Sequence, residues 1–226
     1  RACASGGGAG RSLGGCSDAE VQRFVEGGEG ADTLEGTDGA VLSGDRGDDL
    51  YLFGPGDGAI SIHDGPTGAA SGSDTVQIDF NLRDAATGEI APDIRQVAGT
   101  QDVVFDFGNG DILTVLNTLL GNNADQVESF VFLDETISVA ALRQIIVDGR
   151  ATDGDDVIFG FSGNAFNETL EGGLGDDVLQ GGRGSDTYIY NPGDGDDRKS
   201  GILWRTSDKG YLPPMRPQGN RWQTVD

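Results

Sequence analysis

Aspartate and glycine recur in this chain at a spacing that suits the binding of a cation. The segments GGEGADTLE (27–35), GGLGDDVLQ (172–180) and GGRGSDTYI (181–189) carry glycine at places one, two and four and aspartate at place six, and GDRGDDLYL (44–52) differs only by Asp45 at place two. Glycine allows positive φ, so each segment can turn tightly and point its carbonyl oxygens inward beside one carboxylate. Ca²⁺ accepts such a flexible all-oxygen cage better than Mg²⁺. The pattern therefore predicts calcium sites.

Weaker copies of the nonapeptide lie between the clear ones. Residues 36–43 match it with one residue missing. Residues 151–159 and 163–171 keep the turn and the strand of the unit, with Glu168 in place of the aspartate and residues 160–162 inserted between them. The acids at place six of the second group of repeats are Asp156, Glu168, Asp177 and Asp186.

The elements that position these acids are very short strands. Places seven to nine of each unit form a strand whose middle residue points into the core. One apolar side chain in each unit cannot offset a backbone ordering cost of roughly 1–2 kcal/mol per residue. We therefore expect the bound cation to supply the missing stabilisation. The predicted buried residues are Ile158, Leu170, Leu179 and Tyr188.

On these nonapeptides the chain resembles the repeats-in-toxin (RTX) family of hemolysin-type calcium-binding proteins. The resemblance implies a parallel β-roll in which two nonapeptides make one turn and each calcium ion lies between one loop and the loop two units further on. It implies three ligand sets: Gly154 and Asp156 facing Gly173, Gly175 and Asp177; Glu168 facing Gly182, Gly184 and Asp186; and Gly28, Gly30 and Asp32 facing Gly47 and Asp49.

Both groups of repeats end in the same way. Residues 51–58 (YLFGPGDG) and 188–195 (YIYNPGDG) each consist of an aromatic strand followed by a Pro-Gly-Asp-Gly turn. Each looks like the exit of an RTX array. The chain is therefore predicted to hold two separate calcium modules.

The segment between the arrays has less glycine and more alternating apolar residues. Its Asn109-Gly110 pair lies between two apolar runs, which is a strong signal for a β-hairpin. Ser138 is placed to cap a short helix. This segment resembles the small β-rich domain that accompanies hemolysin-type repeats. The predicted strands are 75–80, 103–107, 112–116 and 127–133, and the predicted apolar face of the helix is Val139, Leu142, Ile145 and Ile146.

The sequence therefore predicts an all-β fold. Two short parallel β-roll (β-helix) arrays flank a small, mostly antiparallel β domain that contains one short helix. The predicted parts are a flexible leader (1–26), the first repeat array (27–70), the β-rich domain (71–150), the second array (151–197) and a disordered or unrelated tail (198–226).

The composition of the chain limits the classes of partner that it is expected to bind. The net charge of -23 disfavours nucleic acid and anionic membranes and favours cations. No run approaches the roughly 18 apolar residues of a membrane helix, so stable membrane insertion is not expected. Cys3 and Cys16 are either a loop disulfide or two incidental thiols. Because the chain begins at Arg1, we expect it to be a processed or partial chain.

Competing kinds of site fit poorly. His63 is the only histidine, and a zinc site needs more histidine or cysteine ligands. The sequence from Asp194 starts like an EF-hand loop but fails at Lys199. Adjacent acids such as Asp176 and Asp177 are interpreted as one ligand and one solvent-facing residue, not as acid/base catalysts. A flexible spacer without ions explains the composition but not the register.

The predicted function is a non-enzymatic calcium-binding module of a secreted protein that folds outside the cell, where calcium is abundant. The resemblance implies export through type I secretion machinery. An alternative is that the chain is the C-terminal secretion and folding fragment of a larger extracellular enzyme or toxin, or part of a calcium-dependent adhesin.

Overall fold

A computed structural model describes residues 23–64, 72–119, 127–161 and 166–199. These residues fall in two compact units. The first unit ends at Ile137 and the second begins at Ser138, and Ile94–Gln96 and Leu119 also belong to the second. The predictions for residues 1–22 and 200–226, among them those for Cys3 and Cys16, lie outside the described residues.

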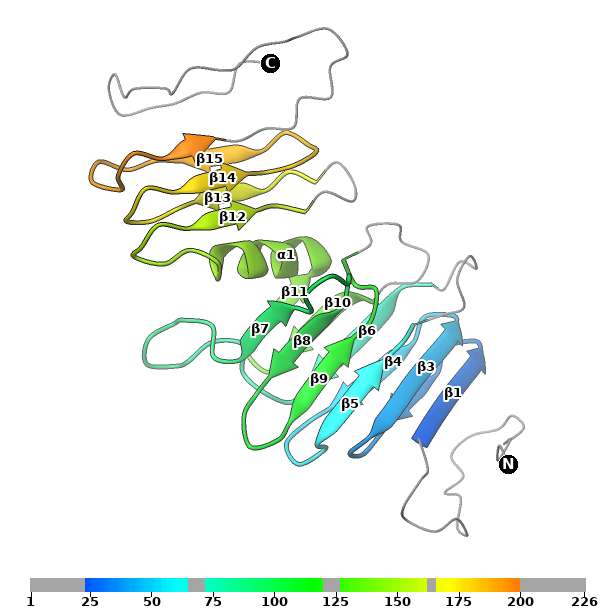
Figure 1. The fold of residues 1–226 in the computed structure, drawn as a ribbon. Coiled ribbons are helices and arrows are strands. Elements are labelled where there is room, and N and C mark those ends of the chain that lie inside the picture. The colour runs from blue at the N-terminus through cyan, green and yellow to red at the C-terminus, as the bar shows by residue number, and fades with distance from the viewer. Residues whose placement is uncertain (1–22, 65–71, 120–126, 162–165, 200–226) are drawn as a thin grey trace, which may run out of the picture. The chain divides into compact units, whose positions relative to one another are not determined.

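The first unit starts as a parallel β-roll in which successive strands alternate between two sheets (Figure 1). One sheet pairs β1 with β3 and β3 with β5, and the other pairs β2 with β4, all in parallel. Two nonapeptides therefore make one turn, as predicted. The bounds of these strands are β1 Arg23–Glu29, β2 Thr33–Glu35, β3 Ala40–Arg46, β4 Leu50–Phe53 and β5 Ala59–Ile62.

Strands of the central segment continue the two sheets of this roll. We expected a mostly antiparallel arrangement here, and β8 and β9 do form the predicted antiparallel hairpin, with Asn109 and Gly110 at φ of 55° and 93°. However, β6 pairs parallel with β4, β10 with β6, and β9 with β5. Strands β6 and β9 thus pair with β4 and β5, whose edges would otherwise expose unpaired backbone groups. The strands of the central segment have the bounds β6 Asp74–Ile78, β7 Asp93–Gln96, β8 Val103–Asp106, β9 Ile112–Val115, β10 Val127–Phe132 and β11 Thr136–Ser138. All of β7 except Asp93 belongs to the second unit.

The core of the first unit combines aliphatic side chains with a cluster of aromatic rings. Leu34 and Leu42 fill the early coils and are buried. Further on, Phe105 lies 5.3 Å from Phe130 between ring centroids, and Phe80 stacks on Phe107 at 4.2 Å. All four of these phenylalanines belong to the central segment, which thus contributes large apolar side chains to this core.

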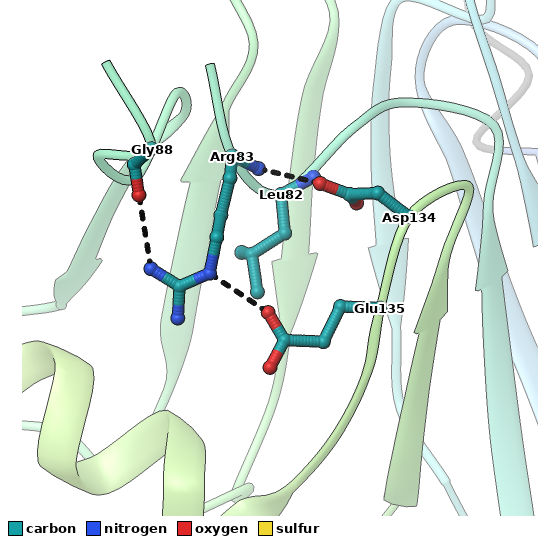
Figure 2. A network of polar contacts seen from close by, with 5 residues as sticks. All are labelled: Leu82, Arg83, Gly88, Asp134 and Glu135. Atoms are coloured by element: carbon teal, nitrogen blue, oxygen red, sulfur yellow. Dashed lines mark hydrogen bonds and ion pairs between the residues drawn. The ribbon is translucent and has the colours of Figure 1, made fainter. Parts of the chain in front are cut away.

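A polar network holds the loop after β6 against the turn between β10 and β11 (Figure 2). Asp134 accepts hydrogen bonds from the backbone N–H groups of Leu82 (2.7 Å) and Arg83 (3.0 Å). The Arg83 guanidinium donates to Glu135 (2.9 Å) and to the Gly88 carbonyl oxygen (3.1 Å). The hydrogen bonds from the backbone N–H groups, that of Leu82 first and that of Arg83 after it, lower the pKa of Asp134. The side chain of Leu82 is thereby fixed in the core, where it is fully buried.

The second unit contains helix α1 (Val139–Asp148), which begins at the predicted cap. The Ser138 hydroxyl accepts a hydrogen bond from the Ala141 N–H group. The buried face is shifted from the predicted one, because Arg143 and Val147 are buried and Ile145 is only half-buried. The guanidinium of Arg143 lies 3.7 Å from the centroid of the Phe166 ring, a cation–π contact that explains how a charged residue can occupy this face.

A second parallel roll follows the helix. One sheet has the order β12-β14-β16 and the other pairs β13 with β15. Ile158 is level with Leu179, and Leu170 with Tyr188. Ile158, Leu170 and Leu179 are buried as predicted, but Tyr188 is only half-buried. The bounds of these strands are β12 Val157–Phe159, β13 Thr169–Glu171, β14 Val178–Gln180, β15 Thr187–Ile189 and β16 Arg198–Lys199.

The residues at the start of the predicted tail still belong to the roll. Arg198 and Lys199 form β16, which pairs parallel with β14. The segment 192–197 repeats the turn of 172–177, with Pro192 in place of the first glycine. Both basic side chains are exposed on β16, so they can be accommodated on this strand of the roll.

Helix α1 covers the first coil of the second roll through Gln144. The Gln144 side chain donates to the Thr169 carbonyl oxygen (2.7 Å) and accepts from the Thr169 N–H group (3.1 Å). It thus pairs with β13 as a neighbouring strand would. Solenoid folds need such a cap, because a bare terminal coil exposes unpaired backbone groups.

Candidate metal centre

The glycines of each turn serve two different purposes. Gly28 and Gly30, at places two and four, have φ of 107° and 111°, as the sequence predicted. The glycine at place one, which the sequence pattern grouped with these two because glycine allows positive φ, does not use this freedom and has another role. A Cβ atom added to Gly44 would lie 2.1 Å from Oδ2 of Asp49, and one added to Gly172 would lie 2.0 Å from Oδ2 of Asp177. Place one is therefore glycine because the place-six carboxylate packs against it.

Each predicted pair of place-six acids is brought together by a backbone hydrogen bond. The acids in each pair belong to coils that are two nonapeptides apart, and the N–H group of the earlier acid donates to the carboxylate of the later one. The donor and acceptor atoms are Asp32 N and Asp49 Oδ1 at 2.8 Å, Asp156 N and Asp177 Oδ1 at 2.8 Å, and Glu168 N and Asp186 Oδ1 at 3.1 Å.

The predicted glycines of paired loops also meet. A Cβ atom on Gly47 would collide with the Gly30 carbonyl oxygen, and one on Gly175 would lie 2.6 Å from that of Gly154. Gly184 packs in the same way against the backbone of Phe166. Gly173 forms a parallel bridge with Thr152, and Gly182 has a φ of 95°. The loops are thus stacked closely enough to share one ion between neighbours.

The series of acids extends beyond the predicted residues. The Asp49 N–H group donates to Asp74 (2.7 Å), the Asp74 N–H group to Glu128 (2.7 Å) and the Asp177 N–H group to Asp197 (3.1 Å). Part of this signal is visible in the sequence. Residues 72–75 (GSDT) repeat residues 184–187, and residues 193–197 repeat the glycine and aspartate places of residues 173–177.

The place-five side chains form a second series of hydrogen bonds with the opposite direction. The Asp155 carboxylate accepts from the Asp176 N–H group, and the Asp176 carboxylate accepts from the Asp196 N–H group, each at 2.9 Å. Asp48 accepts from Ser73 in the same way (2.9 Å). These acids are exposed, as predicted, and each also joins its coil to the next one through a hydrogen bond.

The place-six carboxylates still have unused oxygen atoms. Among the described residues, buried side-chain oxygens without a hydrogen-bond partner include Oδ2 of Asp32, Asp49, Asp177 and Asp197 and both carboxylate oxygens of Glu168. Leaving a buried carboxylate oxygen unpaired costs on the order of several kcal/mol. A cation between the coils would satisfy these atoms. The donor set is entirely oxygen, which fits a hard cation such as Ca²⁺.

The electrostatics of these carboxyls also favour a cation. Burial raises the pKa of Glu168 to about 7, with the neighbouring Asp186 adding to the effect. Burial likewise raises the pKa of Asp49 and of Asp197. In each case neighbouring negative charges disfavour the ionised form, so a positive ion would stabilise it.

Parallel coils joined by glycine-rich turns that carry paired aspartates define this protein as a β-roll with cation-binding turns. Residues 26–60, 150–164 and 162–198 match the family model described as the RTX calcium-binding nonapeptide repeat, in four copies. These segments are RTX repeats, and repeats of this family bind calcium. No curated protein matches the chain. The remaining prediction, that the named glycines and acids are the ligands of each ion, stays a prediction.

Proposed function

We propose that this chain is a secreted module that folds when it binds calcium outside the cell. The RTX repeats make it a calcium-binding repeat module of a kind typical of secreted proteins. The observation that carries the proposal is the set of buried, unpartnered carboxylate oxygens between the coils. Such atoms oppose folding until an ion neutralises them, so folding and calcium binding are expected to occur together.

The calcium gradient across the cell membrane supports the location. Extracellular calcium modules have Kd values of about 10⁻⁴–10⁻³ M, so cytosolic calcium is too low to fill them. The net charge of -23 then keeps the chain expanded through self-repulsion. Outside the cell, calcium binds only the folded form and stabilises it by mass action. An expanded chain suits passage through type I secretion machinery, which we propose as its transient partner.

We also propose that the module itself is not an enzyme. His63 is half-buried at the end of β5, where its backbone N–H group donates to the Leu42 carbonyl oxygen. The acids that come together do so at repeating places, which suits ion binding better than acid/base chemistry.

Within the described residues, no helix has the length and apolar character needed to cross a membrane. A larger extracellular enzyme, toxin or adhesin that includes this module is the second candidate.

Far-UV circular dichroism of the full chain tests the calcium-dependent fold. We expect β-structure to increase with added Ca²⁺ and to disappear with a chelator, whereas Mg²⁺ at equal concentration has a much smaller effect because it requires rigid octahedral coordination. Replacing both Asp177 and Asp186 by alanine should raise the calcium midpoint severalfold, since each supplies a carboxylate to the second roll. A spectrum that responds neither to calcium nor to the chelator would contradict the proposal.

A further inference from the structure

One coil of the first roll carries an acid where the other coils carry glycine. Val25 of β1 is level with Leu42 of β3, and Leu42 is level with Ile62 of β5. Two residues further along the chain in each case, Gly27, Gly44 and Asp64 therefore occupy equivalent positions, Asp64 just after the end of β5. At the first two positions the absence of a side chain makes room for the place-six carboxylate. At the third position, Asp64 adds a second carboxyl group to the turn.

The added carboxyl group joins a compact buried cluster. Asp49, Asp64 and Asp74 each offer a carboxylate oxygen, and these atoms lie within 4.8 Å of one another. The residues are 2%, 2% and 0% exposed. Each has one oxygen in a hydrogen bond, to Asp32 N, Tyr51 Oη and Asp49 N respectively. The Oδ2 atom of each is buried without a partner. Each of the three residues thus keeps one unpartnered carboxylate oxygen in a cluster that almost no solvent reaches.

The position of Asp64 is fixed by Tyr51. The Tyr51 hydroxyl accepts a hydrogen bond from the Gly44 N–H group (2.8 Å) and donates one to Asp64 Oδ1 (2.7 Å). Tyr51 is fully buried, so its ring holds the hydroxyl in place. A ligand that is held in its binding geometry loses little entropy when an ion arrives.

We propose that Asp49, Asp64 and Asp74 form a divalent-cation site with three carboxylate ligands, which binds Ca²⁺ more tightly than the two-carboxylate sites of the repeats. The inference rests on the proposed calcium function and goes beyond it, because Asp64 and Asp74 lie outside the matched repeats. The number of charged ligands and the rigidity of the cage both set calcium affinity. The half-buried Glu128, which accepts from the Asp74 N–H group, adds a further negative charge nearby.

Calorimetric titration of the full chain with Ca²⁺ tests this site. Wild type should show one binding step that is tighter than the rest. Asp64→Asn, which removes one negative ligand at constant size, should weaken that step about tenfold or more and leave the other steps unchanged. Glu89→Gln is the matched control, since it removes the same charge from an exposed residue of the same unit. An Asp64→Asn isotherm identical to that of Glu89→Gln would overturn the proposal.

Two further variants keep the test decisive if Asp64→Asn folds poorly. Asp64→Gly restores the residue that the other turns carry at this position, and it should lose the tight step while keeping its β-structure at high calcium. Asp177→Ala/Asp186→Ala alters only the second roll and should keep the tight step. If the tight step disappears in this double variant, it belongs to the second roll and the assignment to Asp64 is wrong. If wild type binds no calcium at all, the proposed function itself fails.

Discussion

The glycine at place one shows how a single missing side chain sets up an ion site. Gly44 and Gly172 do not need positive φ, and what they provide is room for the carboxylate of Asp49 or Asp177. This role follows from the packing of the turn on itself. It explains why the motif keeps two adjacent glycines when only the second adopts an unusual backbone conformation.

Gly44→Ala tests this role. The new methyl group would lie 2.1 Å from Asp49 Oδ2 and 2.6 Å from Tyr51 Oη, so both groups must move. We expect a loss of about 1–3 kcal/mol in the free energy of unfolding at saturating calcium, typical of overpacking. Thermal unfolding with and without calcium measures it. Gly54→Ala is the control, because its nearest contact would be an ordinary 3.4 Å; a similar loss in both variants would contradict the explanation.

The sequence predicts residues that obey the nonapeptide period and misses those that do not. Asp32, Asp49, Asp177 and Asp186 are recognisable because glycines precede them at constant spacing. Asp64 is not, since its position beside Asp74 depends on the pairing of β5 with β3 and on a longer connection that breaks the period. Local spacing encodes a turn, whereas the contact between two turns is encoded by strand register.

At the scale of elements, helix α1 acts as an end piece for the second roll. The helix and its Ser138 cap follow from local sequence signals. The pairing of Gln144 with Thr169 does not, because it joins residues 25 positions apart and a glutamine on a helix is usually only a solvated side chain. The burial of Arg143 could not be predicted from local sequence either, because it depends on the contact with the ring of Phe166.

Gln144→Ala should loosen the first coil of the second roll. The substitution removes the two hydrogen bonds that the Gln144 side chain makes with the backbone of Thr169, one as donor and one as acceptor, each worth about 0.5–1.5 kcal/mol. Hydrogen exchange at β13 in saturating calcium should become faster, while exchange in β4 of the first unit stays the same. Gln144→Glu keeps an acceptor but loses the donor, so we expect an intermediate effect. Equal protection of β13 in all three proteins would mean that Gln144 has no capping role.

At the scale of the whole molecule, the apo chain should respond to acid in the opposite direction from most proteins. Burial raises the pKa of Glu168 to about 7 and that of Asp74 to about 8, in each case above the ordinary value for the residue type. At any pH between the ordinary carboxyl pKa and the raised one, the folded state therefore binds more protons than the unfolded state. Stability from these groups is fully present below the ordinary carboxyl pKa and is lost as pH rises through about 7 to 8.

Circular dichroism in the presence of a chelator measures the direction in which stability changes with pH. Lowering the pH from about 8 to about 5 should increase the β-structure of the calcium-free chain, because protons partly replace the missing cations. At saturating calcium the same change in pH should have little effect above about pH 6, since the ion holds the carboxyls ionised. A calcium-free chain that loses structure steadily over this range would contradict the assignment of raised pKa values.

The two opposed series of hydrogen bonds have a consequence for how such a roll can lengthen or shorten. Place-six carboxylates reach back to the previous turn on the same edge, and place-five carboxylates receive from the following one. Each turn thus offers matching hydrogen-bonding groups only to the turn two nonapeptides away. Adding or deleting nonapeptides in pairs preserves the match, whereas a single insertion moves all later turns to the opposite edge. Whole pairs are therefore the unit in which this architecture can be copied.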